Sequence, residues 1–147
     1  MLRCDWLLVF LAAAPGDALD PVRVQKGMFL LAMQAPLAAS ARYAFEPYAY
    51  GPMSRDLYRD VRRLRGEHRL DATPVAGASW QLLTLTATGR ERAAQLRRRA
   101  GRDHPEALAQ VDALRREISG LSFAELLEQV YERYPAYAVR SVFRRPA

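Results

Sequence analysis

Arginines recur along one short stretch of this 147-residue chain at a spacing that places them on one side of a helix. Within residues 54–65, Arg55, Arg59 and Arg62 fall together at about 100° per residue, and Arg63 lies beside them. A guanidinium group binds a phosphate or the edge of a guanine through two parallel hydrogen bonds. The chemistry that this pattern indicates is recognition of a polyanion, and double-stranded DNA is the first partner that we expect.

The other side of the same stretch is apolar. Leu57, Val61 and Leu64 fall opposite the arginines, so the predicted helix buries one face and turns a cationic face outward. An alternative is that Asp56 and Asp60 pair with the arginines three residues further on, and that the charged face is only solvated.

Composition favours an acidic partner for a single folded domain. The net charge is +6 and the isoelectric point is about 10.0, while half of the residues are hydrophobic. Only Lys26 among the 22 basic residues is a lysine. A GC-rich coding sequence is an alternative explanation for this excess of arginine, but it does not account for where the arginines fall.

Residues that could support catalysis or hold a metal are sparse. Cys4 is the only cysteine and has no base near it in the sequence, while His68 and His104 stand far from any second ligand at metal-binding spacing. Lys26 precedes Gly27 without the glycine-rich turn of a phosphate-binding loop. We therefore expect no enzyme, no catalytic residue, no metal and no cofactor.

The cellular location is predicted from the same features. A lone cysteine fits a reducing compartment, so we expect a cytoplasmic protein. The apolar stretch 2–14 is short and is interrupted by Asp5, which disfavours a secretory signal. No apolar run reaches the roughly 20 residues that span a bilayer, so a membrane is not an expected partner.

The elements that must position the arginines follow from caps, breakers and periodicity. We expect helices at 2–14 (ended by Pro15–Gly16), 21–34 (capped by Asp20), 54–65 (capped by Ser54), 86–101 (Thr86 as its cap), 105–119 and 122–134 (Ser122 as its cap). Residues 42–50 are predicted to be extended, Gly51–Pro52 to turn, residues 68–85 to form a β-hairpin with strands at 68–75 and 80–85, and the tail 137–143 to dock back.

This order resembles known winged-helix proteins. The stretch LTATGRERAAQL, with Leu85, Thr86, Gly89 and Arg90, is similar to the strand-to-helix signature of MarR-type and PadR-type regulators. The stretches VQKGMFLLA, FEPYAYGPMSRDLYRDVRRL and YPAYAVRSVF look more closely like the YwgA-like proteins and the related Panacea antitoxin domain. Together these stretches are spread over most of the chain, from residue 24 to residue 143.

The resemblance implies a winged-helix core and no enzyme. Tyr50, Gly51, Pro52 and Ser54 match the family's turn into the third helix, while Leu57 and Leu64 match its core positions. Panacea domains are associated with neutralising toxins through protein contacts. The resemblance therefore implies either a DNA-binding regulator or a protein-interaction module.

The fold class that we predict is mainly α with a small β-hairpin, a winged helix-turn-helix with additional C-terminal helices. Residues 1–102 form the DNA-binding core, and residues 103–147 form a helical extension for dimerisation or packing within one domain. The predicted function is sequence-specific or general binding of duplex DNA in transcriptional regulation, through helix 54–65 and wing 68–85. The candidate DNA-binding residues are Tyr50, Ser54, Arg55, Arg59, Arg62, Arg63 and Arg69.

One question about assembly and two roles besides DNA binding stay open. The chain is expected to form a homodimer, and Leu108, Val111, Ile118, Leu126 and Val130 are either the dimer surface or core within one chain. The second possible role is a protein-interaction module of an antitoxin or phage-defence accessory type. The third is binding of RNA or of a membrane surface through charge alone. The sequence shows no aromatic platform on which the bases of a single strand could stack, which argues against RNA.

Overall fold

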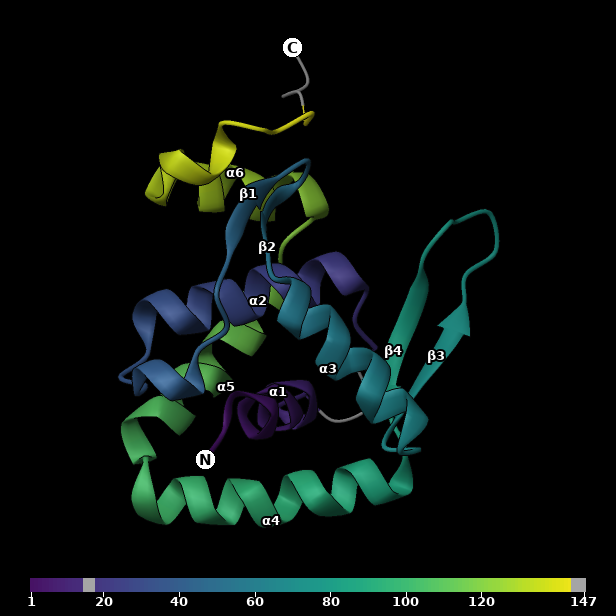
Figure 1. Cartoon of the computed structure of the whole chain (residues 1–147), viewed down its shortest axis with the longest axis vertical. Helices are drawn as coiled ribbons and strands as arrows, with labels where there is room; N and C mark the ends of the chain where they lie inside the picture. The colour runs from purple at the N-terminus through teal and green to yellow at the C-terminus, as the bar shows by residue number, and fades with distance from the viewer. Residues whose placement is uncertain (15–17, 144–147) are drawn as a thin grey trace.

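The computed structural model describes residues 1–14 and 18–143, a mainly helical chain with two small antiparallel sheets of two strands each (Figure 1). The α-helices are α1 (Arg3–Ala12), α2 (Pro21–Gln34), α3 (Arg55–Gly66), α4 (Ala87–Asp103), α5 (Pro105–Ser119) and α6 (Phe123–Arg133). Of the 3-10 helices in the described residues, η1 (Ala39–Ala41) follows α2 and η2 (Pro135–Ala138) follows α6. The predicted helices are confirmed to within a residue or two, and the predicted stop at Pro15–Gly16 lies outside the described residues.

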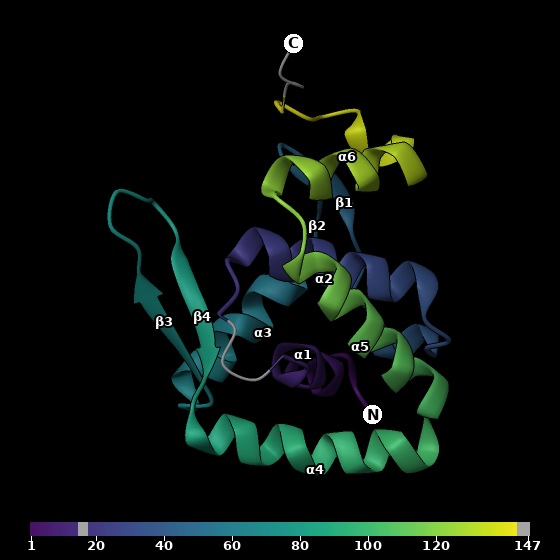
Figure 2. The ribbon, with the colours of Figure 1, turned by 180° about the vertical axis from the view of Figure 1, so that it is seen from behind.

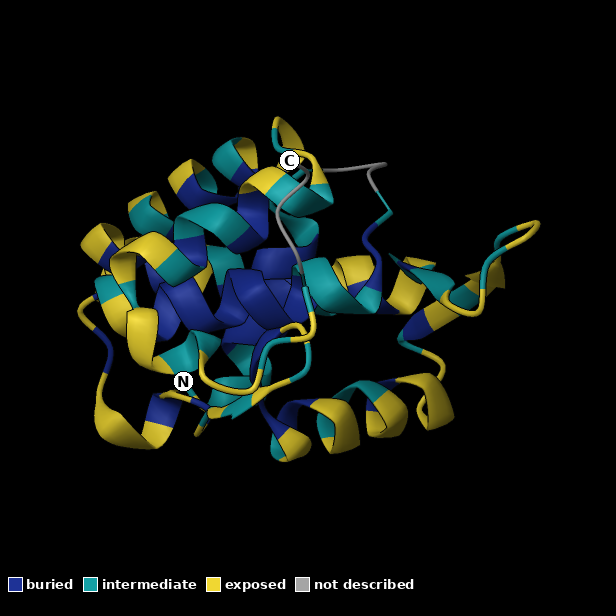
Figure 3. Cartoon of the chain, turned by 90° about the horizontal axis from the view of Figure 1, so that it is seen from above, coloured by how far each residue is buried: buried dark blue, intermediate teal, exposed yellow. Residues whose placement is uncertain are grey.

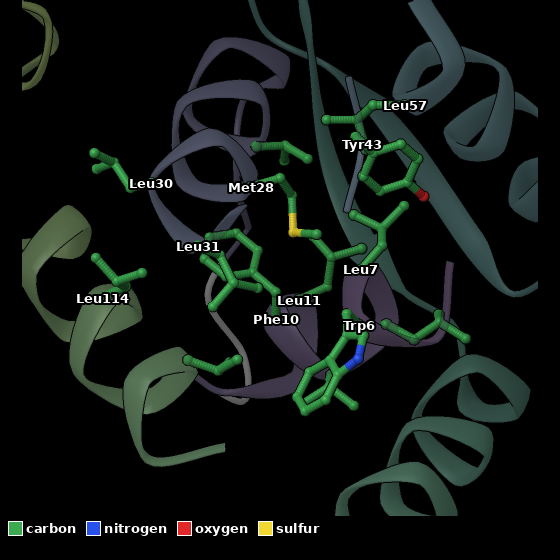
Figure 4. Close-up of a cluster of buried hydrophobic side chains, with 14 of the residues drawn as sticks. Trp6, Leu7, Phe10, Leu11, Met28, Leu30, Leu31, Tyr43, Leu57 and Leu114 are labelled. Carbon is green, nitrogen blue, oxygen red and sulfur yellow. The ribbon is translucent and has the colours of Figure 1, made fainter. Parts of the chain in front are cut away.

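Helix α1 lies at the centre of the molecule, with α2, α4 and α5 packed around it (Figures 1 and 2). Residues 6–11 are all buried, so the middle of this helix has no solvent face. A helix that is apolar on every side needs such a central position. Side chains from four helices meet there, among them Phe10, Leu31, Leu57 and Leu114 (Figure 4).

The predicted hairpin is present as β3 (Leu70–Pro74) and β4 (Gln81–Leu85). It stands out from the helices with an exposed tip (Figure 3). Its base is anchored, because Leu83 is buried and exchanges two backbone hydrogen bonds of 3.1 and 2.8 Å with Leu19, just before α2. The segment before α2 therefore fixes the hairpin to the helical core.

A second hairpin separates α2 from α3. Strands β1 (Glu46–Tyr48) and β2 (Gly51–Met53) pair antiparallel, with Pro47 opposite Pro52 and Tyr48 opposite Gly51. The extended structure expected in residues 42–50 is confirmed for this part, but the turn predicted at Gly51–Pro52 is wrong. The chain turns at residues 49–50, and Gly51 follows with a φ of +85°, a conformation that glycine adopts without strain. The connection from α2 to α3 is thus a hairpin rather than a short turn.

The C-terminal helices share the core of the preceding residues. Val111 and Ile118 of α5 and Leu126 and Val130 of α6 are fully buried, and Leu108 is partly buried against the same cluster. The structure therefore decides the open alternative for the four fully buried side chains, which are core within one chain, while Leu108 stays partly exposed. The predicted boundary at 102/103 falls where α4 ends and α5 begins.

The tail docks back as expected. The backbone N–H of Val142 donates to the carbonyl of Ala49 in the β1–β2 turn at 2.9 Å, and Tyr131 donates to Ser141 at 2.6 Å. Among the described residues, no helix combines the length and the apolar character that crossing a membrane requires.

Candidate nucleic-acid interface

The start of α3 is held in place from α2. Ser54 Oγ accepts from the backbone N–H of Leu57 at 3.3 Å, which makes it the helix cap that its position predicts. The Gln25 side-chain amide accepts from the Ser54 backbone N–H at 2.9 Å and donates to the Ser54 carbonyl at 3.1 Å. Because Ser54 is only 1% exposed, its predicted contact with a phosphate is corrected: it positions the helix from beneath.

Lys26, the next residue on α2, reinforces this junction. Its ammonium group is buried and donates to the carbonyl of Pro52 at 3.0 Å. Burial lowers the pKa of Lys26 to about 8, and the charge of Asp20 opposes this shift. The only lysine of the chain therefore serves the interior, so it is not part of a basic surface.

The end of α3 is fixed to the base of the hairpin and to the start of α4. Thr86 caps α4 by accepting from the Gly89 backbone at 3.0 Å, and its hydroxyl donates to the carbonyl of His68 at 2.7 Å. The backbone N–H of Thr86 donates to the carbonyl of Arg69 at 3.1 Å. A side chain at position 89 would overlap that same carbonyl, so any residue larger than glycine at this point of α4 forces the backbone to shift. The Leu-Thr-x-x-Gly-Arg signature thus fixes α3, the hairpin and α4 to one another.

The outer face of α3 carries the charge that the sequence predicts. Leu57 and Leu64 are buried and Val61 is partly buried, so the inner face is core. The four arginines predicted on the outer face are all exposed: Arg55, Arg59, Arg62 and Arg63. Arg65 is exposed as well, although it is not among the predicted site residues. The helix holds five arginines and two aspartates, a net charge of +3.

Three of these arginines have acidic neighbours. Arg59 pairs with Asp56 at 3.1 Å and Arg63 with Asp60 at 3.2 Å, as the alternative of a solvated charged face predicts. Arg55 pairs with Glu46 of β1 at 3.2 Å. Exposed pairs such as Arg55–Glu46 contribute little stability, about 0–1 kcal/mol each, whereas the Asp60 side chain is only 15% exposed and its pair is partly buried.

The two aspartates of α3 also bind α1 and the loop before β1. Arg3 approaches Asp56 at 3.2 Å and Asp60 at 3.9 Å, and the Tyr43 hydroxyl donates to Asp60 at 2.6 Å. Burial first, and then the bond to Asp60, raises the pKa of Tyr43 well above its usual range. The side of α3 that faces α1 is therefore an ion-pair network.

Arg62 and Arg65 lie on the other side of α3. Within residues 1–14 and 18–143, none of the ion pairs or side-chain hydrogen bonds involves either residue. Both line a cleft of about 860 Å³ between the start of α2, α3 and the hairpin. The spacing of Tyr58, Arg62 and Arg65 is itself helical, and this signal in the sequence could have revealed the face.

The last two predicted site residues stand at the margins. Arg69 lies at the base of the hairpin, 3.8 Å from Glu67. Tyr50 is exposed in the β1–β2 turn, lines the cleft and packs edge-on against Phe123 with ring centroids 5.8 Å apart. The structure thus brings Tyr50 and Arg62 to one cleft, leaves Arg55, Arg59 and Arg63 on the outer face, and separates Ser54 from the surface.

Chemically reactive groups are not concentrated here. Burial raises the pKa of the Cys4 thiol, which makes the thiolate scarcer at neutral pH. Among the residues that the structure describes, His, Cys, Asp and Glu side chains form no group of three or more that could hold a metal ion. What the described site offers is exposed cationic and aromatic surface for binding.

Comparison with known proteins gives no relative for this site: no protein-family model matches the chain, and no curated protein matches it. The resemblance to MarR-type, PadR-type, YwgA-like and Panacea proteins therefore stays a prediction. A function for this chain has to be inferred from its own residues.

Proposed function

We propose that this chain binds double-stranded DNA through the outer face of α3, with the β3–β4 hairpin as a wing beside it. The observation that carries the proposal is the division of α3 into a buried face of Leu57 and Leu64 and an exposed face of arginines. The major groove, about 12 Å wide, admits one helix, and arginines on that helix reach guanine edges or the flanking phosphates.

The arrangement of elements supports a winged-helix interpretation. Three helices, α1 to α3, precede the hairpin, and the backbone bridge between Leu19 and Leu83 joins the α1–α2 connection to the edge of β4. The hairpin then stands next to α3, as a wing beside a recognition helix would (Figure 1). The β1–β2 hairpin between α2 and α3 is a departure from a simple helix-turn-helix.

Arg55, Arg59 and Arg62 are the residues that we expect to contact the duplex. The ion pairs of Arg55 with Glu46 and of Arg59 with Asp56 do not prevent this, because an exposed pair is weak and a phosphate offers an equivalent partner. We also expect Arg69, at the base of the hairpin, to contact an adjacent phosphate. Regulation of transcription and assembly of a homodimer on two half-sites remain parts of the proposal.

The decisive experiment titrates a fluorescently labelled duplex of mixed sequence at several salt concentrations. The variant R55A/R59A/R62A is expected to bind the duplex more weakly at every salt concentration. The slope of log affinity against log salt is expected to fall by about 2.7, because each arginine that no longer neutralises a phosphate lowers it by about 0.9.

The matched control is R98A/R99A/R102A, which removes the same charge from exposed positions near the far end of α4, away from the hairpin (Figure 1). Because these side chains are exposed, neither triple variant is expected to change thermal stability by more than about 0.5 kcal/mol per substitution. The proposal fails if both triple variants bind the duplex equally well.

A second candidate is a protein-interaction module of the antitoxin or defence-accessory type. It is favoured by the composition of the hairpin, since residues 70–85 include no basic side chain and Asp71 is their only charged residue. Trp80 near the tip is exposed, and tryptophan is a frequent anchor of protein interfaces. The outcome that favours this candidate is a wild-type chain that is folded but does not bind the duplex even at low salt.

A further inference from the structure

Aromatic residues from distant parts of the chain converge on the cleft beside α3. Tyr50 comes from the β1–β2 turn, Tyr58 from α3, Trp80 from the hairpin and Phe123 from the start of α6, and all four line the same cleft. Tyr50, Tyr58 and Trp80 are each among the exposed large hydrophobic side chains. The sequence shows no platform on which bases could stack, because these residues become neighbours only in the folded chain.

The charge of the cleft complements a phosphate. Arg62 and Arg65 form one wall and have no ion pair among the described residues. The lining includes one carboxylate, that of Asp20, which is already bonded to Arg23 at 2.6 Å. Arg23 is committed as well, because its guanidinium also donates to the carbonyl of Leu121 at 3.0 Å. In the described part of the lining, the two cations left without a partner are therefore those of α3.

We infer that the cleft binds a segment of single-stranded nucleic acid, with unpaired bases against Trp80 and Tyr58 and phosphates on Arg62 and Arg65. Aromatic faces combined with a cationic track are the two components of known single-strand sites. A base pair inside a duplex has both faces covered by its neighbours, so only an unpaired base can stack on these rings. This inference rests on the proposed function, since both require that arginines of α3 bind nucleic acid.

The length of the cationic track favours a strand over a free nucleotide. Arg55 and Arg65 are separated by ten residues of helix, or about 15 Å along the axis. Arg62 belongs both to the cleft and to the outer face, so the positive surface continues beyond the cleft. A mononucleotide bound in the cleft would leave this continuation unused.

The two tryptophans make the test direct. Trp80 is 44% exposed at the cleft, whereas Trp6 is 1% exposed in the core and serves as an internal reference. Titration with a thymidine oligonucleotide of about ten residues is expected to quench the fluorescence of the wild-type chain. In W80F, where only Trp6 reports, the emission is expected to stay constant.

The oligonucleotide affinities of variants separate the contribution of Trp80 from that of Arg62 and Arg65. Measured with labelled oligonucleotide, W80A is expected to bind about 5-fold to 150-fold more weakly, the usual loss for one stacked base. R62A/R65A is expected to bind more weakly, and its salt slope is expected to fall by about 1.4, at about 0.7 per phosphate neutralised in a single strand. The matched control R98A/R99A removes the same charge from exposed positions of α4 and is expected to bind like the wild type.

Four outcomes decide against the inference, and they differ in what they say of the proposed function. Duplex binding without oligonucleotide binding overturns the single-strand site and leaves the proposed function standing. Oligonucleotide binding that survives both W80A and R62A/R65A places the strand elsewhere. Thymidine monophosphate binding as tightly as the oligonucleotide makes the cleft a small-molecule site. If neither nucleic acid binds, both proposals fail together.

Discussion

The substitution Gly89→Ala adds one methyl group where α3, the hairpin and α4 meet, and so tests how tightly these elements are packed together. A Cβ at residue 89 would overlap the carbonyl oxygen of Arg69 and lie 3.0 Å from its carbonyl carbon. These are backbone atoms, so no side chain can rotate away. In Gly89→Ala, either the first turn of α4 or the backbone at the end of α3 must move.

The cost follows from the bonds at this junction. If the backbone moves only slightly, the strain that remains at the overpacked contact is about 1–3 kcal/mol. If it yields, the bond from the Thr86 N–H to Arg69 and the bonds from the hydroxyls of Thr86 and Thr88 to His68 weaken, at about 1 kcal/mol each. The better helix propensity of alanine returns up to about 1 kcal/mol. We expect a net loss of about 1–3 kcal/mol in the free energy of unfolding.

Urea denaturation followed by circular dichroism measures this loss, and the same helix supplies the control. In Gly101→Ala the added Cβ meets only Leu108 Cδ2 within 4 Å, at an ordinary contact distance of 3.8 Å. That variant is expected to be as stable as the wild type or up to about 1 kcal/mol more stable. Equal stabilities for the two alanine variants would refute the tight junction and the role assigned to the Leu-Thr-x-x-Gly-Arg signature.

Three further predictions concern the supports of α3. Burial lowers the pKa of Lys26 from 10.5 to about 8, so the unfolded chain binds more protons between these pH values. The free energy of unfolding therefore rises by about 3 kcal/mol as pH increases through that window, and this gain is lost as pH falls back toward 8. Comparing the pH dependence of the stability of wild type and of K26M across the window measures the gain. Parallel pH curves for the two proteins would contradict the prediction. Q25L removes both partners of the buried Ser54 backbone, and urea denaturation is expected to show a loss of about 2–4 kcal/mol; a loss below about 1 kcal/mol would mean that water replaces the amide. Y43F removes the 2.6 Å bond to Asp60 and is expected to cost about 1.5–3 kcal/mol in the same assay, whereas unchanged stability would show that Arg3 and Arg63 satisfy that carboxylate alone.

The helices and their caps could be predicted because their signals are local. Asp20, Ser54, Thr86 and Ser122 each accept a hydrogen bond from the backbone N–H three residues further on, as the capping rule requires. The hairpin at β3–β4 follows from alternation around a glycine turn, which is also local. Such features need no knowledge of what packs against them.

Features that depend on distant contacts were predicted poorly. Ser54 has a good capping position and a polar side chain, but nothing in its neighbourhood reveals that Gln25 covers it from α2. The Gly51–Pro52 pair is typical of a turn, yet the pairing of β1 with β2 draws it into a strand. The aromatic lining of the cleft could not be predicted for the same reason, since Tyr50 and Trp80 are far apart in the sequence and line one cleft only in the folded chain.

The charge of α3 shows why a count of arginines is not enough to rank their roles. Asp56 and Asp60 lie toward α1, so Arg59 and Arg63 must exchange a carboxylate for a phosphate on binding, whereas Arg62 gains a partner without losing one. Exchange of an exposed pair costs about 0–1 kcal/mol, so the paired arginines remain usable but contribute less. Single alanine substitutions should therefore weaken nucleic-acid binding most at Arg62 and least at Arg63, which also approaches Glu67 at 3.9 Å. The reverse order would mean that the ion pairs hold the binding face in its active shape.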